Sequence, residues 1–394
     1  MNLLETLNNK KILIWGYGLE GKSTHKFIKE NSPSTQVEIF EGKYEEINTE
    51  SYDLIFKSPG IPMPKDNEKI TSQAEVFIKD YKDKIIGITG TKGKSTTSTM
   101  LYEALKQVST KKILLLGNIG IPFLDAYNEI DDNTIVVCEL SCHQLLKQTS
   151  SPHIAIFLNL FEDHLDVYKT RENYFLAKLN ITNYQTNNDY LLVSKDTPSI
   201  DTLAKVIEIN KDKEFNLTLK GEHNQLNANF VYYIIKNILN IDNEEQIIKS
   251  IEEFNGLKHR LELVKTLNEV NYYDDSISTI PEATIQAANS IENTKTILIG
   301  GMDRNINYDI LIDFIQKKQN ITFICMYESG KRIYNSLTNK ENVIYIETLK
   351  EAVVKAKEIT PKNSACILSP AAASYGYFKN FEERGDSFKK YLED

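Results

Sequence analysis

Two glycine-rich stretches of this chain have the residue types that bind phosphate. Residues 16–23 read Gly-Tyr-Gly-Leu-Glu-Gly-Lys-Ser and fit the phosphate-loop pattern Gly-x4-Gly-Lys-Ser at every position. Residues 89–96 read Thr-Gly-Thr-Lys-Gly-Lys-Ser-Thr, with Ile88 where the first glycine of that pattern belongs. Each stretch follows a short apolar run and precedes a helix-like segment. Both loops are therefore expected to aim backbone N–H groups at a phosphate.

An acid at the end of a neighbouring strand assigns ATP to the second loop. Chemistry on a triphosphate needs Mg²⁺, which prefers hard oxygen ligands. The apolar run 134–138 leads directly into Glu139, whereas the run 52–56 leads into Lys-Ser-Pro-Gly and offers no acid. We therefore predict that Lys94 contacts the β- and γ-phosphates and that the Ser95 hydroxyl binds the metal, although the second loop fits the strict pattern less well.

The first loop leaves a rival interpretation open. Gly16, Gly18 and Gly21 also fit Gly-x-Gly-x-x-Gly, and Glu41 follows the next expected strand, where a ribose-binding acid belongs. This pattern is typical of a nicotinamide-dependent oxidoreductase. It is also compatible with tight packing of a strand–helix turn. We favour a nucleotide-linked substrate, because that accounts for both loops together.

Two further residues are candidates for the metal site. His164 comes just beyond the strand expected over 154–158, at the strand end where parallel sheets bind ligands, and a neutral imidazole can coordinate a metal. A single histidine is more often structural, but its place one strand after Glu139 favours the ligand. Lys178 falls on a helix between apolar neighbours and would by itself be read as a surface lysine.

The elements that must position these residues alternate along the whole chain. Strand-like runs are expected near 11–15, 37–40, 52–56, 85–88, 112–116, 134–138, 154–158, 190–193, 270–274, 296–299, 321–325, 343–346 and 365–368, with amphipathic segments between them. This alternation predicts parallel α/β layers. A length of 394 residues predicts two or three domains. The charged stretch 79–84 and the stretch 255–260 are the expected boundaries.

Composition narrows the class of protein. Hydrophobic residues make up 41% and charged residues 26%, which is typical of a globular protein. A net charge of −9 without any long Lys/Arg block argues against nucleic acid as a partner. No apolar run approaches transmembrane length and residues 1–11 are polar, so we expect a cytoplasmic protein without membrane insertion. The four cysteines are expected to be reduced thiols, and Cys138 and Cys142 an ordinary strand end and loop rather than a metal or redox site.

Taken together, these pieces resemble the Mur ligase family, the ATP-dependent amide-forming enzymes of peptidoglycan precursor synthesis. Residues 89–96 are similar to the family loop Gly-Thr-Asn-Gly-Lys-Ser/Thr, with Lys92 in place of asparagine, and residues 159–168 resemble its Asn-x-x-x-Asp-His-x-Asp segment. Further matches are 117–120, 139–141, 221–224, 259–260, 369–374 and 380–386. The resemblance spans the chain and is greatest to the branch of the family that adds D-glutamate.

The resemblance implies three domains. They are a Rossmann-like UDP-substrate domain at 1–83, a central ATP-binding domain of the P-loop ATPase type with a mostly parallel sheet at 84–257, and a Rossmann-like amino-acid-binding domain at 258–394. It also implies two Mg²⁺ ions organised by Ser95, Glu139, His164 and a carbamate on Lys178. The carbamate would turn a cation into an oxygen ligand. We expect a monomer.

The resemblance also implies binding residues for each substrate. For ATP these are Gly90, Thr91, Lys92, Gly93, Lys94, Ser95, Thr96, Asn224, Asn227, Arg260 and Asp275. For the UDP-linked muramoyl substrate they are Gly18, Leu19, Glu20 and Glu41 near the uridine, Ser58, Gly60 and Asn118 near the diphosphate, and Ser141. For the amino acid they are Thr279, Ser374, Tyr375 and Phe381.

The implied reaction activates a carboxylate with the γ-phosphate of ATP and then joins the acyl phosphate to an amino acid. The expected substrates are UDP-N-acetylmuramoyl-L-alanine and D-glutamate. This chain has Ile277 where the family carries a lysine that would pair with the acidic substrate. L-glutamate or another amino acid therefore stays open, with Arg304 as a replacement charge. A non-catalytic scaffold is disfavoured by the joint presence of Lys94, Glu139, His164 and Lys178, and folate polyglutamylation by the uridine-type first domain.

Overall fold

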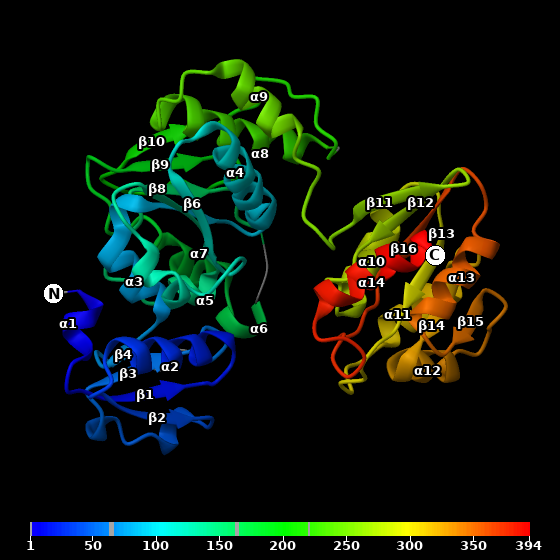
Figure 1. Cartoon of the computed structure of the whole chain (residues 1–394), viewed down its shortest axis with the longest axis horizontal. Helices are drawn as coiled ribbons and strands as arrows, with labels where there is room; N and C mark the ends of the chain where they lie inside the picture. The colour runs from blue at the N-terminus through cyan, green and yellow to red at the C-terminus, as the bar shows by residue number, and fades with distance from the viewer. Residues whose placement is uncertain (1, 63–66, 162–164, 220) are drawn as a thin grey trace. The chain divides into compact units, whose positions relative to one another are not determined.

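The computed structural model describes residues 2–62, 67–161, 165–219 and 221–394, and side chains throughout these ranges except those of residues 165 and 166. The chain forms two compact units, Met1–Asn255 and Gly256–Asp394. The first contains two sheets and the second contains one (Figure 1). All three are α/β layers with mostly parallel strands, which confirms the predicted fold class.

The first sheet has the strand order β2-β1-β3-β4, and every pairing in it is parallel. Its strands are β1 (Lys11–Trp15), β2 (Gln36–Phe40), β3 (Leu54–Lys57) and β4 (Ile70–Thr71). The helices are α1 (Leu3–Leu7), α2 (Leu19–Asn31) and α3 (Gln73–Tyr81), with short 3₁₀ turns η1 (Tyr44–Glu46), η2 (Thr49–Ser51) and η3 (Lys82–Lys84). The charged stretch 79–84 is thus the end of α3 and a 3₁₀ turn that leads into the next strand.

The second sheet has the order β10-β9-β8-β5-β7-β6 and is also wholly parallel. Its strands are β5 (Ile85–Thr89), β6 (Lys112–Gly117), β7 (Thr134–Glu139), β8 (Ile154–Phe157), β9 (Tyr190–Val193) and β10 (Lys205–Glu208). The helices are α4 (Lys94–Val108), α5 (Cys142–Leu145), α6 (Leu165–Tyr168), α7 (Arg171–Leu179), α8 (Glu222–Tyr233) and α9 (Glu244–Glu252). Two 3₁₀ turns, η4 (Phe123–Asp125) and η5 (Tyr127–Glu129), and a π-helical turn η6 (Ile234–Ile238) complete it.

Aromatic side chains join the first two sheets into one unit. The Phe77 ring on α3 lies 5.1 Å from the Phe123 ring on η4, and the Phe27 ring on α2 lies 5.1 Å from the Tyr127 ring. These residues share one apolar core with strand residues of the second sheet. Buried aromatic contacts of this kind stabilise by more than their area alone. The two sheets are therefore held together as a single body.

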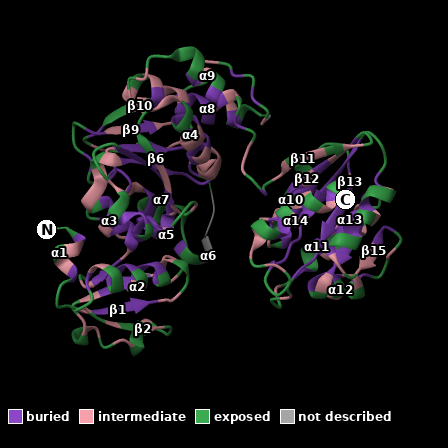
Figure 2. Cartoon of the chain, in the orientation of Figure 1, coloured by how far each residue is buried: buried purple, intermediate pink, exposed green. Residues whose placement is uncertain are grey.

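The third sheet has the order β11-β12-β16-β13-β14-β15. Its strands are β11 (Glu262–Leu267), β12 (Val270–Asp274), β13 (Thr294–Ile299), β14 (Thr322–Met326), β15 (Val343–Ile346) and β16 (Ser364–Leu368). Its helices are α10 (Pro281–Ser290), α11 (Asp309–Lys317), α12 (Tyr327–Ser336), α13 (Leu349–Ile359) and α14 (Phe381–Glu393). The central strands β13, β14 and β16 are almost wholly buried (Figure 2). Apolar runs of this kind are typical of parallel strands covered on both faces.

The strand β11 is absent from the sequence prediction and is antiparallel to β12. A two-residue turn joins them, in which Asn268 and Glu269 both have positive φ. Such a turn matches the twist of a hairpin, but it is usually signalled by glycine, which this turn lacks. All six residues of β11 are at least partly exposed at this edge of the sheet.

Candidate active site

The second glycine-rich loop connects β5 to α4 and is held by the end of β8. Gly90 and Gly93 have φ values of +149° and +85°, a region that L side chains rarely adopt. The Asn159 side chain accepts hydrogen bonds from the backbone N–H groups of Thr91 and Lys92, at 3.1 and 2.9 Å. The first backbone N–H groups of α4 have no acceptor within the helix, as in any helix. They are directed to the N-terminal end of α4, where a helix favours a bound anion. The loop therefore has the geometry of a phosphate cradle.

Two lysine ammonium groups converge on this loop. The Lys94 Nζ donates to the carbonyl oxygens of Gly90 and Thr91, both at 3.0 Å. The Lys178 Nζ donates to the same Gly90 carbonyl at 2.8 Å. Lys178 is only 1% exposed, and its ammonium lies 4.6 Å from the centre of the Tyr174 ring. Lys178 is thus not the surface lysine that its sequence context suggests, because α7 directs it into the base of the loop.

Glu139 lies at the same edge of the sheet. Its strand β7 pairs with β5 so that Glu139 is opposite Ile88, and the Thr89 hydroxyl donates to the Leu140 carbonyl at 2.9 Å. The Glu139 Oε1 accepts from Asn118 Nδ2 at 2.7 Å. Its Oε2 is buried and has no hydrogen-bond partner among the described residues. A buried carboxylate oxygen without a donor fits a hard cation such as Mg²⁺.

The remaining predicted ATP residues of the first unit surround this loop. Ser95 and Thr96 lie in the first turn of α4, directly after Lys94. A side chain added at Gly93 would place its Cβ 3.1 Å from the Asn227 Oδ1, so Asn227 lies against the loop backbone. Asn227 also donates to Asn224 at 3.4 Å, and both asparagines are buried on α8. His164 lies outside the described residues.

The first glycine-rich loop brings together the ends of β1, β2 and β3. The Ser58 hydroxyl donates to the Gly16 carbonyl at 3.0 Å, and the Tyr17 N–H donates to the Glu41 carboxylate at 3.4 Å. Gly18, Leu19 and Gly60 lie beside these residues and are not buried. Gly18, Leu19, Glu41, Ser58 and Gly60 therefore gather at one edge of the first sheet, where ligands of open α/β sheets bind. Asn118, the other residue predicted near the diphosphate, follows β6 of the second sheet instead.

A polar connection that the sequence did not predict links this loop to the ATP edge. The Glu20 carboxylate accepts from Gln144 Nε2 at 3.0 Å. Gln144 also closes a capping box with Ser141, whose hydroxyl accepts from the Gln144 backbone N–H at 3.2 Å. Burial raises the pKa of Glu20, while the hydrogen bond from Gln144 opposes that rise. Glu20 thus faces the second sheet, two residues from the exposed Gly18.

Sequence reasoning also missed Lys57, which follows the apolar part of β3. Its Nζ donates to the carbonyl oxygens of Ser58 and Ile61, at 2.9 and 2.6 Å. Burial lowers its pKa from 10.5 to about 8, against a favourable interaction with Glu20. The only sequence signal was a charged residue ending a buried strand. Lys57 fixes the turn that carries Ser58 and Gly60.

In the second unit, Asp275 directly follows β12 and is buried. Its Oδ2 accepts from the Ser369 hydroxyl at 2.7 Å and its Oδ1 from the Leu261 N–H at 3.3 Å. Burial raises the pKa of Asp275 from 3.8 to about 6, although these hydrogen bonds and the charge of Arg260 oppose the shift. Arg260 itself is exposed.

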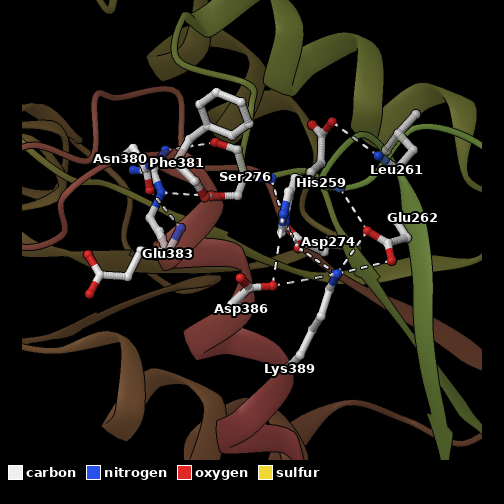
Figure 3. A network of polar contacts seen from close by, with 12 residues as sticks. His259, Leu261, Glu262, Asp274, Ser276, Asn380, Phe381, Glu383, Asp386 and Lys389 are labelled. Atoms are coloured by element: carbon white, nitrogen blue, oxygen red, sulfur yellow. Dashed lines mark hydrogen bonds and ion pairs between the residues drawn. The ribbon is translucent and has the colours of Figure 1, made fainter. Parts of the chain in front are cut away.

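A charged network fixes the segment that carries Arg260 (Figure 3). The His259 Nδ1 lies 2.7 Å from an Asp274 oxygen, and the His259 N–H donates to Glu262 at 2.7 Å. The Lys389 ammonium, from α14, lies 3.0 Å from both Glu262 oxygens and 3.9 Å from Asp274. His259, Glu262 and Asp274 are close enough together to bind a metal ion. The Lys389 ammonium already provides the cation of this cluster, so we assign it a structural role.

The predicted amino-acid residues lie on loops around the same sheet. The Arg304 guanidinium donates to the Thr279 carbonyl at 3.1 Å. The Phe381 carbonyl accepts from the Ser276 hydroxyl at 2.8 Å, and its ring meets the His259 ring edge to face. Ser374 is buried, whereas its neighbour Tyr375 is 60% exposed. These contacts bring Thr279 and Arg304 together, and they anchor Phe381 beside Ser276.

The fold and the loop define a P-loop nucleotide-binding protein of the α/β class. Residues 88–250 match the model of the Mur ligase middle domain. The chain is 32% identical to the UDP-N-acetylmuramoylalanine–D-glutamate ligase of Oenococcus oeni, over 98% of this chain and 97% of that protein. It is also 32% identical to the ligase of the same name from Aquifex aeolicus, over 97% and 98% of the two chains.

Two solved structures share the fold at lower sequence identity. The UDP-N-acetylmuramate-alanine ligase MurC of Thermotoga maritima matches with a TM-score of 0.57 and 19% identity, over 98% of this chain and 99% of that one. The MurF ligase of the same organism, solved with ADP, matches with a TM-score of 0.57 and 15% identity, over 100% and 97%. The chain therefore belongs to the Mur ligase family of ATP-dependent acid–amino-acid ligases.

Proposed function

We propose that this chain joins D-glutamate to UDP-N-acetylmuramoyl-L-alanine, with conversion of ATP to ADP and phosphate through an acyl phosphate. Its curated relatives are named for this ligation and align over nearly the whole chain. The observation that carries the proposal is the convergence of Lys94, Lys178 and Glu139 on one loop at one sheet edge. This set of charges suits phosphoryl transfer to a carboxylate, a reaction that depends on positioning and charge neutralisation.

Each part of the loop has a role in this proposal. The amides at the start of α4 and the Lys94 ammonium bind the β- and γ-phosphates. Ser95 and Glu139 would hold Mg²⁺ through a hydroxyl and the buried Oε2, and His164 would add a ligand by family resemblance. Mg²⁺ held there would neutralise charge on the transferred phosphoryl group. Asn159 keeps the loop in its cradle conformation through Thr91 and Lys92.

A carbamate on Lys178 belongs to the same proposal. The Lys178 amine is almost fully buried and lies beside the loop carbonyl of Gly90. A carbamate there would supply oxygen ligands to a second Mg²⁺ and would place a negative charge near Lys94. Mass spectrometry of the intact protein, prepared in the presence and absence of bicarbonate, would detect the added CO₂.

The remaining substrates are assigned to the two other sheets. The uridine and diphosphate bind at the first loop, with Glu41, Ser58 and Gly60 beside it. ATP also uses Asn224, Asn227, Arg260 and Asp275. The amino acid binds at Thr279, Arg304, Ser374, Tyr375 and Phe381, where Arg304 offers its charge to a substrate carboxylate in place of the family lysine replaced by Ile277. We propose three domains, at 1–83, 84–257 and 258–394, each built around one of the three sheets.

We propose a cytoplasmic monomer without nucleic-acid partners. Among the described residues, no helix combines the length and the apolar composition needed to cross a bilayer. The four cysteines are buried and unpaired.

The test is phosphate release from ATP with UDP-N-acetylmuramoyl-L-alanine and a panel of D- and L-amino acids. D-glutamate should give the fastest release. Lys94→Ala should abolish it, while Lys106→Ala, an exposed lysine on the same helix, should not. Lys178→Ala should be inactive and partly restored by short-chain carboxylates, which should not restore Lys94→Ala.

Faster release with L-glutamate would change the assigned stereochemistry. Nicotinamide reduction without phosphate release would overturn the ligase and favour an oxidoreductase.

A further inference from the structure

The loop that carries Arg304 is fixed at its start by α12. Gly300 has a φ of +120°, and a side chain there would place its Cβ 2.0 Å from the Met326 carbonyl oxygen. The Gly301 N–H donates to the Ser329 hydroxyl at 2.8 Å, and the Ser329 N–H donates back to the Gly301 carbonyl at 3.1 Å. The chain therefore leaves β13 along one path.

Arg332, also on α12, holds the next part of the loop through contacts with residues before and after Arg304 in the sequence. Its Nε lies 2.8 Å from the Asp303 Oδ2, and its Nη2 donates to the Ile306 carbonyl at 2.6 Å. The second Asp303 oxygen accepts from the Asn305 N–H at 2.9 Å, which supports a positive φ of 57° at Asn305. The guanidinium thus forms an ion pair with the residue before Arg304 and donates a hydrogen bond to the carbonyl two residues after it.

The Arg304 side chain extends from this turn to the segment after β12, where it donates to the Thr279 carbonyl at 3.1 Å. Its direction depends on the backbone of the turn, because a long side chain is otherwise free to adopt many rotamers. A fixed turn lowers the entropy cost of holding the guanidinium where a ligand carboxylate binds. Arg332 touches neither Thr279 nor any other predicted amino-acid residue through a described hydrogen bond or ion pair.

We propose that Arg332, together with Asp303, is a positioning residue that sets the affinity for the incoming amino acid by holding Arg304 beside Thr279. This inference rests on the proposed function, in which Arg304 pairs with a carboxylate of that amino acid. The Asp303–Arg332 pair is partly exposed, with side-chain exposures of 17% and 39%. Such a pair contributes little to global stability. Its effect is therefore on the geometry of one loop.

The test measures steady-state kinetics of the full chain with Arg332→Gln, Asp303→Asn and the double variant. Each single change should raise the KM for glutamate about tenfold, the effect expected when one charge-assisted hydrogen bond to the ligand is weakened. Each should leave kcat and the KM for ATP within about twofold. The double variant should be no worse than the poorer single variant, because both changes break the same pair. Arg332→Lys should recover part of the affinity. The matched control is Lys331→Gln, the exposed neighbour on α12.

The outcomes separate this inference from the proposed function. If Arg304→Gln raises the KM for glutamate while Arg332→Gln leaves it unchanged, the inference is wrong and the proposed function stands. Equal increases in the KM values for all three substrates, or additive effects in the double variant, would also reject it, because they indicate general damage. If the unmodified chain releases no phosphate with any acidic amino acid, both proposals fail.

Discussion

Replacing Asp275 by asparagine should change how the stability of the Gly256–Asp394 unit depends on pH. Burial raises the pKa of this carboxyl group from 3.8 to about 6. The folded state therefore binds more protons than the unfolded chain between these two values, so stability falls as pH rises through this interval. The loss of stability is nearly complete by about pH 7, and its total is about 3 kcal/mol. Of this total, about 1.4 kcal/mol of stability is lost between pH 5 and pH 8.

The asparagine variant lacks this titration but keeps the shape of the side chain. Its amide oxygen can accept from the Leu261 N–H, and its NH₂ group faces the Ser369 hydroxyl. Relative to the unmodified chain, the variant should therefore gain about 1.4 kcal/mol of stability when the pH is raised from 5 to 8. Hydrogen exchange of β12 and β16 peptides, read by mass spectrometry, measures the opening free energy of this unit. Comparing both proteins at the same pH removes the intrinsic pH dependence of exchange.

The control for this experiment is Asp313→Asn, an exposed acid on α11. It should show the same difference from the unmodified chain at both pH values. If Asp275→Asn behaves like this control, the carboxylate titrates near its usual pKa and the reasoning from burial is refuted.

Three further predictions concern packing and binding. Gly21→Ala should weaken binding of the UDP-linked substrate and lower the melting temperature, because the added Cβ would lie 2.1 Å from the Gly16 carbonyl oxygen. In the control Gly18→Ala the added Cβ meets no atom within 4 Å, so this variant should melt like the unmodified chain. Calorimetry measures the melting temperature, and fluorescence of the single tryptophan measures binding. Arg384→Leu should destabilise the second unit by about 3–5 kcal/mol, because it removes three buried hydrogen bonds to Ser276 and Ala372. In the control Lys390→Leu, which changes an exposed lysine of the same helix, the loss should be less than about 0.5 kcal/mol. Urea unfolding followed by hydrogen exchange measures both losses. Lys57→Met should raise the KM for the UDP-linked substrate about tenfold without changing the KM for ATP, because it removes the two hydrogen bonds that hold the turn at Ser58. If the variant and the unmodified chain have the same KM for the UDP-linked substrate, Lys57 does not have this role.

Local periodicity was enough to predict most of the fold. Buried parallel strands consist of short apolar runs with glycine-rich or acidic ends, so most strands of the three sheets could be predicted from the sequence without knowledge of tertiary contacts. The exceptions are edge elements. β4 is two residues long, and β10 and β11 are half exposed, so their composition carries little signal.

The candidate site divides in the same way. The loop at 89–96 and the acid Glu139 could be joined from sequence alone, because parallel strands place their carboxyl ends at one edge. The burial of Lys178 could not be predicted from the sequence, because a lysine between apolar neighbours on a helix can face either solvent or the core.

The sequence by itself determined the family and most of the buried strands, and it predicted which loop binds phosphate, because each of these depends on short patterns of neighbouring residues. Only the tertiary structure decided which polar groups hold those loops in place. Asn159 at the phosphate loop, Gln144 beside Glu20 and Arg332 around Arg304 come from distant parts of the chain. Their roles depend on hydrogen bonds of fixed length and direction, and no local pattern specifies the partner across such a separation.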